Sequence, residues 1–238
     1  MNLNKGTLRL VYEDSLWFFG KLLFLYITLP LTAAWIVYGI AFELEDTVSA
    51  LYGPAYFFFV PAYGIMAFKS LFAIAISLGS TRSQLLKSFY AVGIASVALY
   101  FLLLNICQFL IQLLYDQGVS SVALGSAGGW FIGEYQFFQY LWVDIMLGMF
   151  LFGSAFFIYC IVYRIGMTRG LIGGLIVGIV LMFLYFTGAL DAPVEWVSSL
   201  NMSAITVITL VGVVGLVFLL VSYPIMRNAS LAPKAMRE

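Results

Sequence analysis

The 238-residue chain is 63% hydrophobic, carries only 9% charged residues and has a mean hydropathy of +1.05. Soluble domains contain about 25% charged residues, so this composition excludes a water-soluble globular protein. The net charge is zero, which argues against a nucleic-acid partner. Histidine is absent, so the commonest general base and metal ligand is missing. Cys107 and Cys160 lie within apolar runs and are expected to be buried, inert thiols.

Six apolar stretches are each long enough to cross a bilayer, which takes about 20 residues. Turn-forming and polar residues separate them, as expected for short connecting loops. The predicted spans are residues 22–41, 55–77, 89–115, 137–163, 170–190 and 203–225. They use most of the chain, so the sequence predicts an all-α, polytopic membrane protein with one transmembrane domain over residues 1–238.

Residues 5–20, ahead of the first span, have the pattern of an amphipathic helix. Lys5, Arg9 and Glu13 recur every four residues. The apolar surface would come from Leu8, Leu16, Trp17 and Phe19. Such a helix is expected to lie in the membrane interface rather than to cross the bilayer. No small-residue cleavage site follows the first apolar run, so we expect that run to be a span and not a signal peptide.

The basic residues indicate the orientation of the chain. With a cytoplasmic N-terminus and six alternating spans, all 11 Lys and Arg residues fall on the inner side or near it. The outer loops and the adjacent span ends instead collect acidic residues, namely Glu43, Glu45, Asp46, Asp116, Glu134, Asp144, Asp191 and Glu195. Because Lys and Arg determine topology, we expect both termini to be cytoplasmic.

The sequence offers no recognisable catalytic group. Without histidine, neither a serine–histidine dyad nor an HExxH zinc site can form. Asp144 is the only acid well inside a predicted span, so a paired-aspartate protease is also excluded. The chain has no GxxxxGK[ST] loop for binding ATP. We therefore expect no catalytic residues, no metal site and no cofactor bound by this chain, which leaves transport or service to a transporter.

Polar residues gather in the outer halves of two predicted spans. Asn105, Gln108 and Gln112 share one face of the third span, because they are three and seven residues apart. Asp144 lies at a comparable depth in the fourth span. These four side chains either line an outward-facing pathway for a substrate or form hydrogen bonds between helices.

Lys69 is the other charged residue inside a predicted span. It stands eight residues before the end of the second span. Its side chain either snorkels toward the cytoplasm along its own stem or faces inward at an inner gate.

Gly170, Gly174 and Gly178 form a small-xxx-small series at the start of the fifth predicted span. This spacing lets two helices approach closely. The partner helix belongs either to the same chain or to a second copy in a dimer.

The segment Ser77-Leu78-Gly79-Ser80-Thr81-Arg82-Ser83-Gln84-Leu85-Leu86-Lys87-Ser88-Phe89 follows the second span on the predicted cytoplasmic side. It resembles the GxTRxxF-like element of small six-span permease subunits of bacterial ABC exporters. In that family the loop forms a short coupling helix that docks into a separate ATPase subunit. The resemblance therefore implies that coupling would fall to Gly79, Ser80, Thr81, Arg82, Ser83 and Gln84. A polar, basic turn is also what the positive-inside rule places in any short cytoplasmic loop.

The resemblance implies a permease subunit in the bacterial cytoplasmic membrane that works as a dimer or with a sister permease. ATP and Mg²⁺ would be bound by the partner ATPase on the cytoplasmic side. The second inner loop, 164–169, is too short to indicate another ATPase contact, and the short outer loop 191–201 makes a large re-entrant hairpin doubtful. The 18% aromatic content suits an amphipathic or hydrophobic cargo, such as a peptide or an antimicrobial compound.

Two other functions are compatible with the sequence. A six-span substrate-binding subunit of a vitamin or metal importer would use the polar group at 105, 108, 112 and 144 as an outer pocket. A membrane sensor or immunity protein would capture a peptide without moving it.

Overall fold

The computed structural model describes residues 3–42, 47–49, 55–117, 122–133, 135–189, 191, 195 and 202–229. Helices make up most of this part: α1 (Leu3–Ser15), η1 (Leu16–Thr28), α2 (Leu29–Ala41), η2 (Ala55–Phe59), α4 (Val60–Ser77), α5 (Arg82–Asp116), α6 (Ala127–Phe131), α7 (Phe137–Ile165), α8 (Met167–Phe186) and α10 (Ala204–Arg227). The two η elements are π-helices. The only sheet in the described part is one parallel pairing of β1 (Thr47–Ser49) with β2 (Val122–Leu124), in which Thr47 lies opposite Val122.

Six of the described helical stretches are long and apolar enough to cross a membrane, which confirms the predicted number of spans. They are Lys5–Ala41, Phe57–Ser77, Arg82–Asp116, Phe137–Ile165, Met167–Phe186 and Ala204–Arg227. The predicted helical architecture of a multi-pass membrane protein is thus confirmed.

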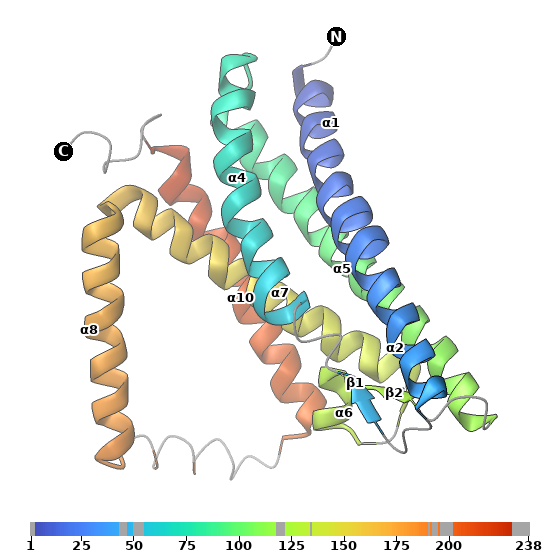
Figure 1. The fold of residues 1–238 in the computed structure, drawn as a ribbon. Helices are drawn as coiled ribbons and strands as arrows, with labels where there is room; N and C mark the ends of the chain where they lie inside the picture. The colour runs from blue at the N-terminus through green and yellow to red at the C-terminus, as the bar shows by residue number, and fades with distance from the viewer. Residues whose placement is uncertain are drawn as a thin grey trace.

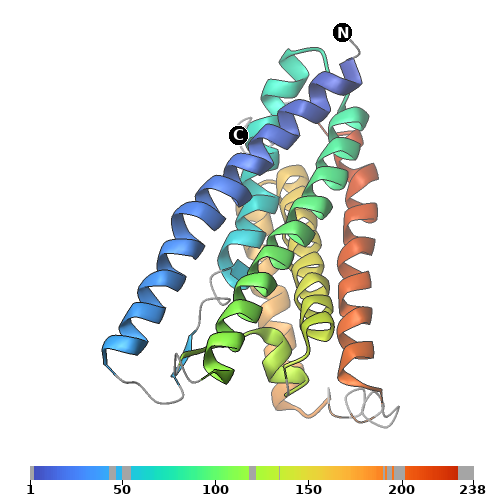
Figure 2. The ribbon, with the colours of Figure 1, turned by 90° about the vertical axis from the view of Figure 1, so that its right-hand side faces the viewer.

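The helices alternate in direction (Figures 1 and 2). The start of α1, the α4–α5 turn, the α7–α8 turn and the end of α10 lie at one end of the molecule. The ends of α2, α5 and α8 and the start of α10 lie at the other end. Arg82, Arg164, Arg169 and Arg227 all stand at or near the first end. This distribution agrees with the positive-inside pattern of the sequence.

The first predicted span differs from the structure at its start. Residues 5–20 do not form a separate helix, because α1, η1 and α2 continue as one helical run from Leu3 to Ala41 (Figure 1). At about 1.5 Å per residue this run is far longer than a hydrocarbon core of about 30 Å. Gly20 does not interrupt it, and Pro30 falls near the N-terminus of α2.

The face that α1 and η1 turn inward shares only Phe19 with the predicted apolar surface. Leu8, Leu16 and Trp17 are exposed, whereas Phe19 is buried. The buried face has residues at a spacing of four, namely the small side chains Thr7, Val11 and Ser15, followed by Phe19. Small residues let the helix lie close to α4 and α5, and their hydroxyl groups bond across the contact.

Each π-helix ends two residues before a proline. η1 ends at Thr28 before Pro30, and η2 ends at Phe59 before Pro61. A proline has no N–H to donate and its ring collides with the carbonyl four residues earlier, so a wider turn relieves both problems. The Thr28 hydroxyl donates to the Leu23 carbonyl at 2.8 Å, five residues earlier in the π-helix.

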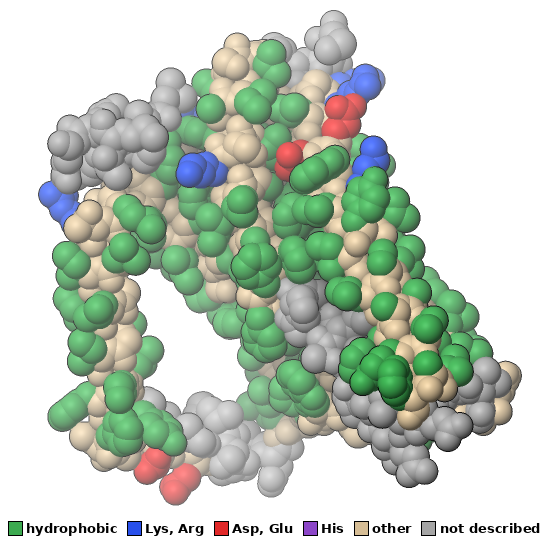
Figure 3. Space-filling view, in the orientation of Figure 1, with side chains coloured by type: hydrophobic (Ala, Val, Ile, Leu, Met, Phe, Trp, Pro, Cys, Tyr) green, Lys and Arg blue, Asp and Glu red, His purple; other side chains and the backbone are tan. Residues whose placement is uncertain are grey.

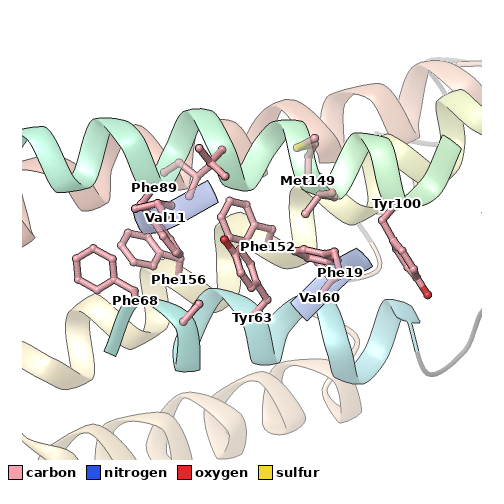
Figure 4. Packing of buried hydrophobic residues seen from close by; sticks show 14 of the residues in the cluster. Val11, Phe19, Val60, Tyr63, Phe68, Phe89, Tyr100, Met149, Phe152 and Phe156 are labelled. Atoms are coloured by element: carbon pink, nitrogen blue, oxygen red, sulfur yellow. The ribbon is translucent and has the colours of Figure 1, made fainter. Parts of the chain in front are cut away.

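Aromatic side chains fill the centre of the bundle (Figure 4). Tyr63 and Phe68 of α4 pack against Phe89 of α5 with ring centroids 5.8 Å and 5.1 Å apart. Phe152 and Phe156 of α7 close the cluster from a third helix, at 5.7 Å and 5.1 Å from Phe89. Offset and edge-on ring pairs at these distances are favourable beyond the area they bury, so the cluster joins α4, α5 and α7.

Helices α7 and α10 cross with their backbones in direct contact. A Cβ on Gly153 would lie 2.6 Å from the Gly215 carbonyl carbon, and one on Gly215 would lie 2.5 Å from the Met149 carbonyl oxygen. Only glycine fits at such a crossing. Beside it, Phe157 and Phe218 stack with centroids 5.0 Å apart and rings within 6° of parallel.

Candidate functional site

The turn between α4 and α5 is tight and fully bonded. The Gly79 N–H donates to the Ile76 carbonyl and the Ser80 N–H to the Ala75 carbonyl, both at 3.0 Å. Gly79 has a φ of +86°, which glycine adopts without strain. This arrangement is a Schellman motif, which ends a helix by satisfying its last carbonyl groups.

Thr81 begins α5 directly after this motif. Its side chain accepts a hydrogen bond from the Gln84 N–H at 3.2 Å, and the Gln84 side chain accepts one from the Thr81 N–H at 3.1 Å. Such a reciprocal capping box satisfies two of the N–H groups left open at a helix start. The T-x-x-Q pattern is visible in the sequence and accounts for the start of α5 at Arg82, earlier than the predicted residue 89.

The predicted short coupling helix over Gly79–Gln84 is therefore wrong. Gly79, Ser80 and Thr81 belong to the turn, whereas Arg82, Ser83 and Gln84 form the first turn of the long helix α5. The Schellman motif and the capping box together leave no room for another helix between α4 and α5. Helices α4 and α5 thus form a helical hairpin with a short turn at its tip.

Neighbouring helices hold this tip from two sides. The Thr7 hydroxyl on α1 lies 2.6 Å from the Ser80 hydroxyl. On the other side, the Ser83 hydroxyl lies 2.7 Å from the hydroxyl of Tyr223 on α10, and Arg82 Nη1 lies 3.5 Å from the Arg227 carbonyl oxygen. A force applied at the tip therefore reaches α1 and α10 as well as α4 and α5.

We call residues 78–83, at the end of the hairpin formed by α4 and α5, the hairpin tip. Leu78 is 65% exposed, and Gly79 and Thr81 are also exposed. Arg82 is half-buried and Lys87 is exposed one turn further along α5. A protruding leucine with nearby positive charges suits an apolar groove with an acidic rim on another protein.

The predicted polar group is brought together only in part. Asn105 and Asp144 are both fully buried, and the Asn105 amide nitrogen donates to Asp144 Oδ2 at 2.7 Å between α5 and α7. Gln108 is also buried, with its amide nitrogen 3.4 Å from the hydroxyl of Ser126. For Asn105 and Asp144 the structure thus has the hydrogen bond between helices, and neither lines an open pathway.

The remaining polar candidates lie at the surface. The Gln112 side chain donates to Asp116 Oδ1 at 3.0 Å, four residues later on the exposed side of α5. Lys69 is exposed on α4 and forms no ion pair within the described residues. An exposed lysine has room to extend along its own helix, as snorkelling requires.

Helix α8 stands apart from the bundle. None of its residues is buried, and an opening separates it from the other helices in Figure 3. A Cβ on Gly170 would meet Val162 at 2.9 Å, but one on Gly174 or Gly178 would meet no atom within 4 Å. Within the described chain, only the first glycine of the predicted series therefore packs against another helix.

Several residues that shape the site were not predicted. Thr7, Ser126 and Tyr223 complete hydrogen bonds with predicted residues but lie far from them in sequence. No spacing along one helix signals such partners. The close crossing at Gly153 and Gly215 also involves two helices, so neither glycine stands out in its own segment.

The described residues include no group of three or more His, Cys, Asp or Glu that is positioned to hold a metal ion. Burial, together with the smaller effects of the charges of Tyr140 and Asp144, raises the pKa of Tyr135, just ahead of α7, to about 12. This phenol therefore stays neutral at physiological pH. No protein family model, curated protein or solved structure matches the chain.

Proposed function

We propose that the chain is the membrane permease subunit of an ATP-driven export complex in a bacterial cytoplasmic membrane. In this function the hairpin tip docks onto a separate ATPase subunit, which binds ATP and Mg²⁺. The observation that carries the proposal is the exposed Leu78 on a tip that is fixed internally by two capping motifs. A large apolar side chain held in water by a rigid turn favours a protein partner.

The bonds around the tip support a mechanical role. Thr7 connects the tip to α1, and Tyr223 connects it to α10. The α7–α10 crossing then continues the connection to a third part of the bundle. ATP-driven movement of the docked partner would therefore tilt several helices together.

A second permease copy completes the proposed complex, with α8 as its contact. None of the 20 residues of α8 is buried, and the Gly174 and Gly178 positions are open. Cargo would move along the interface between the copies. The aromatic-rich spans suit an amphipathic or hydrophobic compound, such as a peptide or an antimicrobial compound.

The importer alternative has less support. A substrate-binding subunit needs polar side chains that are open to its ligand. Asn105 and Asp144 are fully buried against each other, so they offer no such surface.

Purification of the tagged chain from native membranes in mild detergent tests the docking. We expect a P-loop ATPase to co-purify with the wild type and to be lost in Leu78→Glu, because the charge removes the apolar contact. Ile165→Glu is the matched control, since Ile165 is another exposed apolar residue at the same end, at the last position of α7. Recovery of the chain without any nucleotide-binding partner, or full retention of it by Leu78→Glu, would contradict the proposal.

Disulfide crosslinking in membranes tests the second copy separately. Cys107 and Cys160 are first replaced by alanine, and one cysteine is then introduced on α8. Gly174→Cys is expected to form a crosslinked dimer, because the position is open and lies on the glycine series. Ile176→Cys, two residues further and hence on the opposite face, is the control and is expected to remain monomeric. Equal crosslinking at both positions would point to random collision.

A further inference from the structure

The short helix α6, at the end of the molecule opposite the hairpin tip, is fixed to α7 by Tyr140 (Figure 1). A Cβ on Gly128 would lie 2.5 Å from the Tyr140 ring, so only glycine fits where the two helices meet. The Tyr140 hydroxyl donates to the Gly133 carbonyl at 2.6 Å, just after α6 ends. At the other end of α6, the Ser126 side chain accepts a hydrogen bond from the Gly129 N–H at 3.4 Å. Helix α6 therefore has a defined position beside the first turns of α7.

Two large aromatic side chains on α6 are left uncovered by this contact. Trp130 is 68% exposed and Phe131 is 51% exposed. The sequence carries no Lys, Arg, Asp or Glu from position 117 to position 133, so no charge accompanies them. An uncharged segment that exposes two large apolar rings is unfavourable in water.

The start of α7 exposes the same kind of surface. Phe138 is 82% exposed, and Trp142 is exposed one turn further along the same face of the helix. Because α7 is long and apolar enough to cross the membrane, its exposed apolar side chains face lipid. The aromatic side chains of α6 thus lie beside a helix that presents aromatic rings to the bilayer.

The length of α7 indicates the depth of α6 in the membrane. Tyr140, against which α6 packs, is 24 residues before Arg164 at the basic end of α7. This separation is about 36 Å of helix, and α7 is inclined to the other helices in Figure 1. The hydrocarbon core of a bilayer is about 30 Å thick. With Arg164 at one boundary of the core, Tyr140 and α6 therefore lie at the opposite boundary.

We propose that α6 is an interfacial anchor, in which Trp130 and Phe131 insert into the lipid leaflet opposite the hairpin tip, at the boundary between headgroups and acyl chains. Tryptophan suits this level because its ring is apolar, while its N–H bonds to headgroups or water. An interfacial helix buries its apolar side chains about 5–10 Å into this boundary. The inference concerns the opposite end of the molecule from the hairpin tip, so it does not depend on the proposed ATPase partner.

Fluorescence quenching by brominated lipids measures the depth of Trp130. The full chain is reconstituted in phosphatidylcholine nanodiscs after the other four tryptophans are replaced by phenylalanine, namely Trp17, Trp35, Trp142 and Trp196. We expect emission at a shorter wavelength than that of tryptophan in water. We also expect the loss of fluorescence to be greatest when the bromine atoms stand near the headgroup end of the acyl chains, and iodide in the water to quench only weakly.

Two positions calibrate the depth scale in a background in which all five tryptophans are phenylalanine. Ile176→Trp places the probe on an exposed position in the middle of α8 and is expected to be quenched most by bromine near the chain ends. Leu78→Trp places it on the hairpin tip and is expected to be quenched by iodide and not by brominated lipid.

Three results would overturn the proposal. Strong quenching of Trp130 by iodide, without quenching by any brominated lipid, would place α6 in water. Protection from both quenchers would place it against protein, such as a second copy of the chain. Quenching that is greatest for bromine at the chain ends would place it in the bilayer core.

A second variant decides the question should the single-tryptophan chain fail to fold by circular dichroism. A nitroxide is attached to Phe131→Cys, with Cys107 and Cys160 replaced by alanine. Greater access of oxygen than of a water-soluble nickel complex to the nitroxide supports the anchor, because oxygen concentrates in lipid. The reverse order would overturn it.

Discussion

Substitution of Gly215 by alanine tests whether the crossing of α7 and α10 holds the bundle together. The added Cβ would lie 2.5 Å from the Met149 carbonyl oxygen and 2.7 Å from the Phe150 backbone nitrogen. Ordinary van der Waals contact begins at 3.4 Å, so the helices would have to separate by about 0.9 Å. Both obstructing atoms belong to a helix backbone, so a rotamer change cannot relieve the clash.

The expected cost follows from this displacement. Overpacking of a close contact costs typically about 1–3 kcal/mol. For a chain of this size that corresponds to a fall in the midpoint of thermal unfolding of roughly 2–12 °C. Part of the cost would come from the stacked pair Phe157 and Phe218, which shares the crossing.

Thermal unfolding in mild detergent, followed by circular dichroism at the helix band, measures the effect. Gly212→Ala provides an intermediate case, because its Cβ would meet the Met146 side chain at 2.6 Å but backbone, the Met146 Cα, only at 3.0 Å. Gly173→Ala on α8 is the control, since a Cβ there would meet no atom within 4 Å. We expect the midpoint to fall most for Gly215→Ala, less for Gly212→Ala and not at all for Gly173→Ala. Equal midpoints for Gly215→Ala and Gly173→Ala would refute the close crossing.

Three further changes probe the other contacts. Thr81→Ala removes the capping box and is expected to cost about 1 kcal/mol of stability, with Thr81→Ser restoring most of it, as measured by the same unfolding assay. Tyr63→Phe removes the hydroxyl that bonds to buried Ser15 and is expected to lower the midpoint more than Tyr12→Phe on the exposed side of α1. The pKa of Tyr135 is about 12 in the folded protein, whereas a tyrosine in the unfolded chain has a pKa of about 10. The neutral phenol therefore stabilises the fold fully below about pH 10, and this contribution is lost as the pH rises toward 12. The unfolding midpoint of Tyr135→Phe is therefore expected to fall less between about pH 10 and pH 12 than that of the wild type. A midpoint that depends on pH in the same way as in the wild type would contradict the raised pKa of Tyr135.

The helices were predictable because the apolar runs are long and their ends carry recognisable signals. The start of α5 shows the limit of counting apolar residues alone. The polar residues at 81–84 were expected in a short coupling helix separate from the third span, yet their T-x-x-Q pattern begins the long helix α5 itself. The continuity of α1, η1 and α2 was missed for a related reason: the charges of residues 5–20 indicate contact with water, and they say nothing about a break in the backbone.

The sequence predicted the depth of the polar residues along their spans, but it did not predict which of them bond to each other. Asn105 and Asp144 were expected at the same level of neighbouring spans, and the structure brings them into contact. Gln112 belongs to the same predicted face of α5 as Asn105 but lies two turns further along, near the end of the helix. Its side chain bonds there to the exposed Asp116. The glycine pattern was less informative still. The regular series on α8 packs at Gly170 alone, whereas the tightest contact comes from Gly153 and Gly215 on two different helices.

These contacts connect the hairpin tip with the buried acid under the proposed function. The tip is bonded to α10 through Ser83 and Tyr223, and α10 lies against α7 at the glycine crossing. Backbone contact leaves no soft side chain to absorb a movement, so α10 and α7 shift together. Asp144 lies on α7 beyond that crossing, and its bond to Asn105 joins α7 to α5, the helix that begins at the tip. The hydrogen bonds and the crossing therefore close a loop, and a tilt imposed at the tip strains the Asp144–Asn105 bond.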